Sequence, residues 1–169
     1  KKSSFAVVNK INRNYPLSKQ VKVKDTLNFL SKCSSIFREN ISTKIISITG
    51  SCGKTTLKEM IGLTLSKISK TSYSPKSYNN KYGVPLSLFN IKNNDEFGVL
   101  EVGMDKKGEI DNLTKIIKPD LGIITNISYA HSKNFKNINQ IADAKAEIMN
   151  NIKKGGTIIL NKDDKFYNF

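Results

Sequence analysis

The sequence predicts an α/β fold with a mainly parallel, doubly wound sheet. Three observations lead to this prediction. Short β-branched apolar runs alternate with segments whose apolar residues recur at helical spacing, an order typical of right-handed β-α-β units. A segment with two glycines, a lysine and two threonines follows one of these runs, at residues 50–56. Polar residues follow two further runs, and parallel strands bring such ends to the same edge of a sheet.

The first forty residues predict two short strands and one helix. Strands are expected at 5–8 and 21–23, with a polar loop at 12–19 between them that contains Pro16. Asp25 is of the residue type that caps helices, and the apolar residues after it recur at helical spacing as far as Asn40. No residue pattern in this part indicates chemistry.

The remaining elements alternate regularly. Strands are predicted at 45–49, 97–103, 120–127 and 157–160, and helices at 54–69, 84–91, 108–118 and 138–151. Residues 71–85 are polar and turn-rich, so they predict one long loop, and a long loop inside a compact domain is usually functional. Because the chain lacks an initiator Met and stops within an element, we expect it to begin and end inside a longer protein.

Composition limits the classes of function. The 28 Lys and Arg residues outnumber 14 Asp and Glu, which gives a formal net charge of +14. Only Arg13 and Arg38 are arginines, and the lysines are spread along the chain without interleaved aromatics, so we expect a solvated basic surface and no nucleic-acid site. No apolar run has the length of a transmembrane helix. The two cysteines, Cys33 and Cys52, indicate reduced thiols in a cytoplasmic protein.

Residues 45–56, Ile-Ile-Ser-Ile-Thr-Gly-Ser-Cys-Gly-Lys-Thr-Thr, predict a strand, a phosphate-binding loop and the start of a helix. Two glycines allow backbone N–H groups to turn towards an anion, and the helix dipole points to the same place. We expect the loop to bind a polyphosphate, with Lys54 reaching its β- and γ-phosphates and Thr55 binding Mg²⁺. A plain turn would explain the glycines but not the order Gly-Lys-Thr-Thr. The expected phosphate-binding residues are Gly50, Ser51, Cys52, Gly53, Lys54, Thr55 and Thr56.

Two predicted strands end at candidate metal ligands. Glu101 lies near the C-terminal end of the strand at 97–103, where an acid beside a phosphate loop suits Mg²⁺; the alternative is a solvent-facing residue on an edge strand. His131 lies just past the strand at 120–127 and is a candidate second ligand, although a lone histidine is more often structural. In the loop at 71–85, Asn79 and Asn80 either contact a polar ligand or satisfy turns.

In their order and spacing, seven segments resemble the Mur ligases. These segments are residues 49–56, 79–85, 101–104, 108–110, 125–131, 144–147 and 160–164. The resemblance implies that residues 41–169 are an incomplete ATP-binding central domain of this family. It also implies that residues 1–40 are the end of an N-terminal UDP-sugar-binding domain with a linker helix.

The resemblance implies an ATP-dependent ligase that forms a C–N bond in peptidoglycan precursor synthesis. The segments at 79–85, 101–104 and 108–110 favour the member that joins D-alanyl-D-alanine to UDP-N-acetylmuramoyl-tripeptide through an acyl phosphate. The implied catalytic residues are Lys54, Lys145 and His131; the implied metal ligands are Thr55, Glu101, His131 and carbamylated Lys145; and Asn79 and Asn80 lie near the phosphates. Without the resemblance, Lys145 predicts only a lysine stem that lies along an apolar helix face.

Two alternatives remain at this stage. The first is a related ligase with another acceptor, of the MurE or folylpolyglutamate synthase type. The second is a nucleotide- or nucleic-acid-binding module without ligase activity. For the preferred interpretation we expect ATP and Mg²⁺ as cofactors, small-molecule substrates, a monomer and no membrane insertion. We also expect the 169-residue chain by itself to be inactive in ligation.

Overall fold

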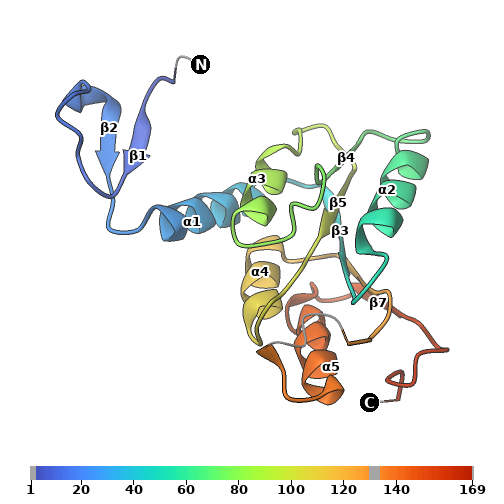
Figure 1. Ribbon diagram of the computed structural model, residues 1–169. Coiled ribbons are helices and arrows are strands. Elements are labelled where there is room, and N and C mark those ends of the chain that lie inside the picture. Colours follow the sequence, from blue (N-terminus) through green and yellow to red (C-terminus); the bar gives the residue numbers. More distant parts are fainter. Residues whose placement is uncertain (1–2, 130–133, 169) are drawn as a thin grey trace.

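Five parallel strands form the central sheet, in the order β4-β5-β3-β6-β7 (Figure 1). The strands are β3 (Lys44–Thr49), β4 (Thr71–Tyr73), β5 (Phe97–Glu101), β6 (Leu121–Ile124) and β7 (Thr157–Leu160). A separate parallel pair, β1 (Ala6–Val8) and β2 (Gln20–Lys22), lies near the N-terminus. The computed structural model describes residues 3–129 and 134–168. The observed sheet confirms the predicted α/β class.

Helices cover both faces of the central sheet. One face carries α2 (Lys54–Leu65), and the other carries α3 (Gly83–Phe89), α4 (Glu109–Ile117) and α5 (Ile138–Ala146). The helix α1 (Thr26–Glu39) packs across α3 and α4 and connects them to the β1-β2 pair (Figure 1). Two 3₁₀ helices, η1 (Leu17–Lys19) and η3 (Glu147–Asn151), complete the described elements. None of the described helices combines the length and apolar character that membrane crossing requires.

Side-chain alternation along the strands produces two hydrophobic clusters. Ile45 of β3 and Leu100 of β5 pack with residues of α3, α4 and α5. Ile48, Val99 and Ile123 point to the opposite face and pack against α2. Successive residues of β3 and β5 are buried on both faces, as is typical of parallel sheets, and the polar residues Ser47, Thr49 and Glu101 are buried with them.

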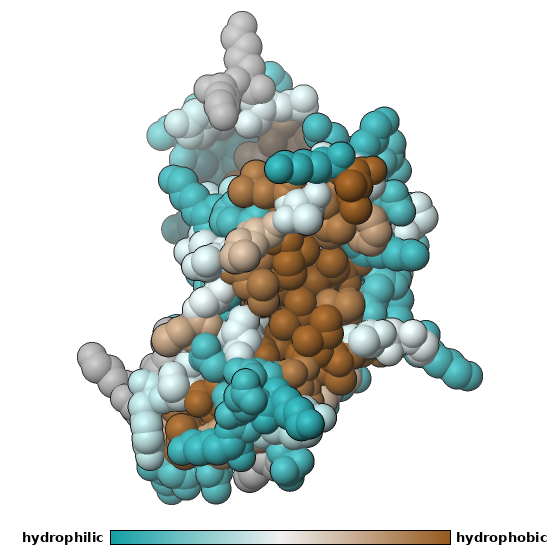
Figure 2. Space-filling view, turned by 90° about the vertical axis from the view of Figure 1, so that its right-hand side faces the viewer, coloured by the Kyte–Doolittle hydropathy of each residue, from teal (hydrophilic) through white to brown (hydrophobic). Residues whose placement is uncertain are grey.

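The sheet face that carries α2 is only partly covered. α2 contacts β3, β4 and β5, whereas β6 and β7 extend beyond it. Ile158 packs into the opposite cluster, so its neighbour Ile159 points to the α2 side, where it is 48% exposed. Figure 2 shows a broad apolar area on this side of the molecule.

A buried arginine joins α1 to the segment between α4 and β6. Arg38 is 2% exposed; its Nε donates to the carbonyl of Ile117 at 2.6 Å, and its Nη2 lies 3.0 Å from Oδ2 of Asp120. That carboxylate oxygen also accepts the N–H of Ile45 at 2.8 Å. Burial lowers the pKa of Arg38, and the charge of Asp120 opposes this shift. These contacts fix where α1 meets the sheet.

Most predicted elements appear within a few residues of their expected positions. The helix cap at Asp25 is confirmed, because its Oδ1 accepts the N–H groups of Leu27 and Asn28. The prediction of one loop over residues 71–85 is wrong at Thr71–Tyr73, which form the edge strand β4. The sequence Thr-Ser-Tyr contains no aliphatic residue, so it lacks the apolar signal that marked the equally short β1 and β2. The predicted helices at 54–69 and 138–151 are shorter in the structure, and the second ends as the 3₁₀ helix η3.

Candidate nucleotide and metal site

Residues 50–53 connect β3 to α2 with two glycines in conformations that other residues rarely adopt. The φ angles are +146° at Gly50 and +79° at Gly53. A Cβ at Gly50 would collide with the side chain of Thr125. Gly53 precedes the first residue of α2, so the unpaired N–H groups of the first helical turn lie at the loop. The backbone therefore has the form expected of an anion-binding loop.

The segment that follows β6 supports this loop through polar contacts. The N–H groups of Ser51 and Cys52 donate to the carbonyl and the side-chain oxygen of Asn126, at 2.9 and 3.0 Å. Oγ1 of Thr125 donates to the carbonyl of Cys52 at 2.6 Å, and Oγ of Ser51 accepts the N–H of Ser128 at 2.8 Å. Sequence reasoning missed this role. Thr125 and Asn126 were expected inside the strand predicted at 120–127, whereas β6 ends at Ile124 and leaves them at the sheet edge.

Thr55, Asn79 and Glu101 meet at the C-terminal edge of the sheet. Oγ1 of Thr55 donates to Oε2 of Glu101 at 2.7 Å, and Nδ2 of Asn79 donates to Oε1 of the same carboxylate at 2.7 Å. Glu101 is 1% exposed, and β5 lies between β4 and β3. The alternative of a solvent-facing acid on an edge strand is therefore wrong.

The oxygen atoms at this edge fit Mg²⁺, which prefers carboxylate and hydroxyl ligands. Within residues 3–129 and 134–168, the carboxylate of Glu101 accepts hydrogen bonds from the neutral donors Thr55 and Asn79, and a buried carboxylate is favoured by a nearby cation. In the same described part of the chain, no three His, Cys, Asp or Glu side chains gather as a metal cluster. The candidate ligands there are thus Thr55 and Glu101. His131, the other predicted ligand, lies outside the described residues.

Among the described residues, Lys54 and Lys145 are two cations associated with the loop. Nζ of Lys54 donates to the carbonyl of Gly50 at 2.8 Å. Lys145, near the end of α5, is 2% exposed, so its amine is buried together with the stem that was expected to lie along the apolar helix face. Burial lowers the pKa of Lys145 to about 8, the charge of Lys54 acts in the same direction, and Cys52 opposes both.

The two neighbouring asparagines have different surroundings. Asn79 contacts Glu101, as described, whereas Oδ1 of Asn80 accepts the N–H groups of Tyr82 and Gly83 at 3.1 and 3.0 Å. Asn80 therefore shapes the turn before α3, which is the structural alternative that its sequence context left open. Both residues also line the cavity described next.

A cavity of about 670 Å³ lies beside Lys54. Its lining combines polar groups of the loop before α3 with apolar side chains of α1 and α4, among them Leu27, Leu113 and Ile116. This size and mixture are typical of a site for a small organic ligand. The cavity therefore lies between α1 and the phosphate loop.

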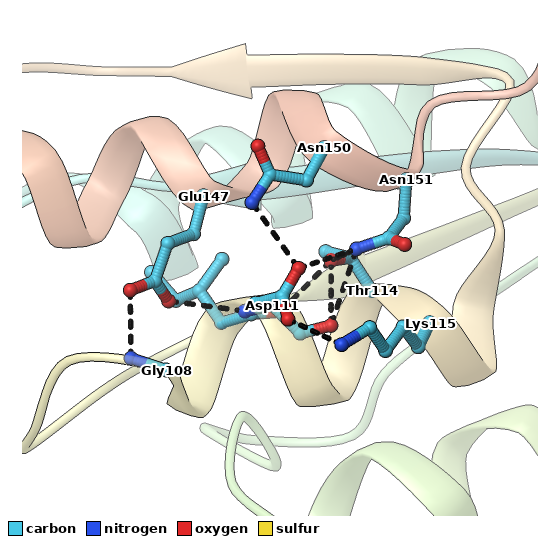
Figure 3. Close-up of polar contacts among 8 residues, drawn as sticks. Gly108, Asp111, Thr114, Lys115, Glu147, Asn150 and Asn151 are labelled. Atoms are coloured by element: carbon cyan, nitrogen blue, oxygen red, sulfur yellow. Dashed lines mark hydrogen bonds and ion pairs between the residues drawn. The ribbon is translucent and has the colours of Figure 1, made fainter.

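The loop that precedes α4 is fixed by Glu147 (Figure 3). Its two carboxylate oxygens accept the N–H groups of Gly108 and Asp111, at 2.6 and 3.1 Å. Lys115 pairs with Asp111 at 2.6 Å, and two asparagine amides of η3 also donate to this carboxylate. These contacts, led by Lys115, lower the pKa of Asp111. The η3 segment, which directly follows α5, thereby holds the start of α4 at the cavity.

Replacing Lys145 with Met is expected to raise the free energy of unfolding at pH 7. A pKa of about 8 in the folded protein, against 10.5 for an ordinary lysine, corresponds to a cost of about 3 kcal/mol for the charged amine. Between pH 8 and pH 10.5 the unfolded chain binds more protons than the folded protein, so the free energy of unfolding of the unsubstituted protein rises with pH. Below pH 8 the full cost of burying the charged amine remains. Urea denaturation in carbonate-free buffer should show a gain for Lys145→Met at pH 7 that shrinks towards pH 10.5. An equal gain at both pH values would contradict this explanation.

Comparisons with known proteins identify the family. The Mur ligase middle domain matches residues 48–169. The UDP-N-acetylmuramoyl-tripeptide–D-alanyl-D-alanine ligase of Bacillus subtilis is 38% identical over 142 residues, which are 84% of this chain and 31% of that protein. A crystal structure of MurF from Acinetobacter baumannii superposes with a TM-score of 0.89 and 35% identity, covering 95% of this chain and 35% of that one. MurF from Thermotoga maritima in complex with ADP gives a TM-score of 0.86 at 28% identity, over 95% and 37% of the two chains.

The chain spans about a third of the length of these relatives. The matched residues include the phosphate loop, the Thr55–Glu101 contact and Lys145. A sequence match and a fold match therefore agree over the same part of the molecule. The chain belongs to the Mur ligase family.

Proposed function

We propose that the protein containing this chain is an ATP-dependent ligase of peptidoglycan precursor synthesis, which joins D-alanyl-D-alanine to UDP-N-acetylmuramoyl-tripeptide. The γ-phosphoryl group of ATP is transferred to the terminal carboxylate of the tripeptide, and the amine of the dipeptide then displaces phosphate from the acyl phosphate. The observation that carries the proposal is the 2.7 Å contact between Thr55 and Glu101 beside the phosphate loop. The names of the relatives support the choice of substrates.

Each residue at the sheet edge has a separate role in the proposed phosphoryl transfer. The N–H groups of Gly53 and of the first turn of α2 bind the phosphates, because those of Ser51 and Cys52 already donate to Asn126. Lys54 exchanges the carbonyl of Gly50 for phosphate oxygens. Thr55 and Glu101 hold Mg²⁺, which supplies positive charge next to the transferred group. Asn79 orients the carboxylate of Glu101 through its hydrogen bond to Oε1. The neighbouring cavity is proposed to receive the tripeptide, whose terminal carboxylate accepts the phosphoryl group, because Lys54 is among its lining residues.

Lys145 is proposed to act as a carbamate that, with His131, helps to hold a second Mg²⁺. Carbamylation adds CO₂ to the neutral amine and releases a proton, and a pKa of about 8 leaves roughly 10% of the side chain neutral at pH 7. The carbamate is an anion, so its formation converts repulsion by Lys54 into attraction. For His131 the support is the sequence motif at 125–131.

The proposal also covers the organisation of the chain. Residues 1–40 are proposed to end a UDP-sugar-binding domain and residues 41–169 to belong to the ATP-binding domain. The separate β1-β2 pair and the position of α1 at the cavity support this division. Both cysteines are free thiols, which accords with the proposed cytoplasmic location. By itself, the 169-residue chain is expected to be inactive in ligation, and the complete protein to act as a monomer.

Phosphate release by the complete protein tests the proposed substrates. Release is expected with ATP, UDP-N-acetylmuramoyl-tripeptide and D-alanyl-D-alanine. Release only with the UDP-muramoyl precursor that carries a dipeptide, together with a diamino acid, would support the MurE-like alternative. Release only with folate and glutamate would support the folylpolyglutamate synthase alternative. Salt-dependent binding to DNA or RNA, with no effect of ATP and Mg²⁺ on thermal stability, would instead support a non-catalytic module.

A further inference from the structure

Lys58 is a fully buried lysine that the proposed chemistry does not use. It lies one turn after Lys54 in α2, and its exposed fraction is 0%. Its Nζ donates to the carbonyls of Ser74 and Lys76 at 2.7 and 2.6 Å, and it lies 2.8 Å from a carboxylate oxygen of Glu59. An ammonium has three N–H donors, so these contacts satisfy all of them. Such complete pairing allows a charge to remain in the interior.

The two carbonyls belong to one short segment between β4 and α3. Within it, Lys76 has a φ angle of +49°, a left-handed conformation that is uncommon for residues other than glycine. The side chain of Lys76 is exposed, while its carbonyl is directed to the buried ammonium. A single cation that binds carbonyls two residues apart determines the path of this turn against α2. Charge-assisted hydrogen bonds offset the unfavourable backbone conformation.

The same segment leads directly into the candidate metal site. Oγ of Ser74 accepts the N–H of Glu101 at 3.3 Å, and Oγ of Ser77 lies 3.5 Å from the hydroxyl of Thr55. Two residues later, Asn79 donates to the carboxylate of Glu101. The buried ammonium therefore lies behind the site and holds the segment that supplies two of its polar side chains.

We propose that Lys58 is a positioning residue for the metal and phosphate site. By binding the turn at 74–76, it places Ser77 and Asn79 opposite Thr55 and Glu101. An apolar residue at position 58 would leave two carbonyls unpaired in the interior, and the segment would shift towards water to solvate them. The carboxylate of Glu101 would then lose the donor that orients it. The identity of the ligand, Mg²⁺ with ATP, rests on the proposed function. The hydrogen bonds by which Lys58 holds the segment, called the clamp below, do not.

Lys58→Met in the complete protein tests this role. The Mg²⁺ concentration for half-maximal ATP-dependent stabilisation, and for half-maximal ligation, is expected to rise about tenfold, as when a residue that orients a metal ligand is lost. The KM for the dipeptide should change less than about twofold, because the substitution does not affect that binding step. A readout without ligand is amide exchange at Gly103, whose N–H donates to the carbonyl of Asn79 at 2.8 Å. We expect this exchange to accelerate about tenfold.

Arg38→Met is the matched control. It also removes a buried cation that donates to backbone carbonyls, but at the junction of α1 with the central domain. It should lower Tm and leave both the Mg²⁺ requirement and the exchange at Gly103 unchanged. If Lys58→Met behaves in the same way as this control, the role of Lys58 is limited to stability and the inference is wrong.

A second pair of variants tests the turn itself and decides the matter if Lys58→Met does not fold. Proline cannot adopt a φ angle of +49°, whereas glycine adopts it freely, so Lys76→Pro should redirect the carbonyl and Lys76→Gly should not. Because the side chain of Lys76 is exposed, both variants leave the core intact. Lys76→Pro is expected to raise the Mg²⁺ requirement about tenfold, and equal requirements for the two variants would overturn the inference. If ATP and Mg²⁺ fail to stabilise even the unsubstituted protein, the proposed function is wrong, and exchange at Gly103 still tests the clamp.

Discussion

Lys54→Met is expected to abolish stabilisation of the complete protein by ATP and to lower kcat for ligation on the order of 10³-fold. Met keeps the length and apolar volume of the lysine stem, so the change removes mainly the charge. In the structure, Nζ of Lys54 is held only 2.8 Å from the carbonyl of Gly50, where it is ready to move to a bound phosphate. Thermal denaturation with and without ATP and Mg²⁺, followed by steady-state phosphate release, measures both effects.

Lys67→Met is a matched control for this experiment. Lys67 follows the end of α2 and is exposed, so the control removes the same charge from the same region without affecting the loop. Its ATP-dependent stabilisation should equal that of the unsubstituted protein. ATP-dependent stabilisation that persists in Lys54→Met would contradict the assignment of Lys54 to the phosphates.

Glu101→Gln is expected to affect function and stability in opposite directions. The amide keeps the shape of the carboxylate but loses its charge, so the Mg²⁺ requirement should rise at least about 100-fold and kcat should fall about 10²- to 10³-fold. The ligand-free protein should be as stable as before or more stable, because a buried carboxylate without a cation is unfavourable. A Mg²⁺ titration of ligation and urea denaturation without ligand measure the two effects separately.

The control for Glu101→Gln is Glu39→Gln, which removes a carboxylate that is 53% exposed and pairs with Lys118 at the surface. Surface pairs of this kind contribute at most about 1 kcal/mol, and no metal requirement should change. If Glu101→Gln instead lowers the free energy of unfolding of the ligand-free protein enough to explain its loss of activity, the carboxylate acts through the fold and not through a metal.

Sequence patterns predicted the parts of the fold that have long apolar signals. The strands β3, β5 and β6 are recognisable because most of their apolar residues are buried, and β7 because it contains the aliphatic run at residues 158–160. β4 was missed because Thr71–Tyr73 pairs only with β5 and consists of residues that also occur in loops. The exact ends of α2 and α5 depend on tertiary contacts, which local propensity does not contain.

The candidate site was predicted only in part, because sequence patterns contain strand ends but not contacts between distant segments. Thr55 and Glu101 were expected at the same sheet edge because parallel strands align their C-terminal ends, and the structure brings them into contact. Lys58 was missed, because a lysine beside helical apolar residues normally lies at the surface. Its burial depends on the carbonyls of Ser74 and Lys76, which belong to another segment of the chain. Contacts of this kind leave no local trace in the sequence.

The parallel order of the strands has a consequence for how the chain folds. The central strand β3 pairs with β5 and β6, so Ile46 meets Val99 on one side and Leu121 on the other. None of the sheet's neighbouring pairs is a hairpin that could form early from adjacent residues, because each is joined by a crossover. Long chain segments must close before the middle of the sheet gains any hydrogen bond. Refolding is therefore expected to be slow for a domain of this size. Because strand edges that are transiently unpaired favour aggregation, refolding should be more efficient in dilute solution.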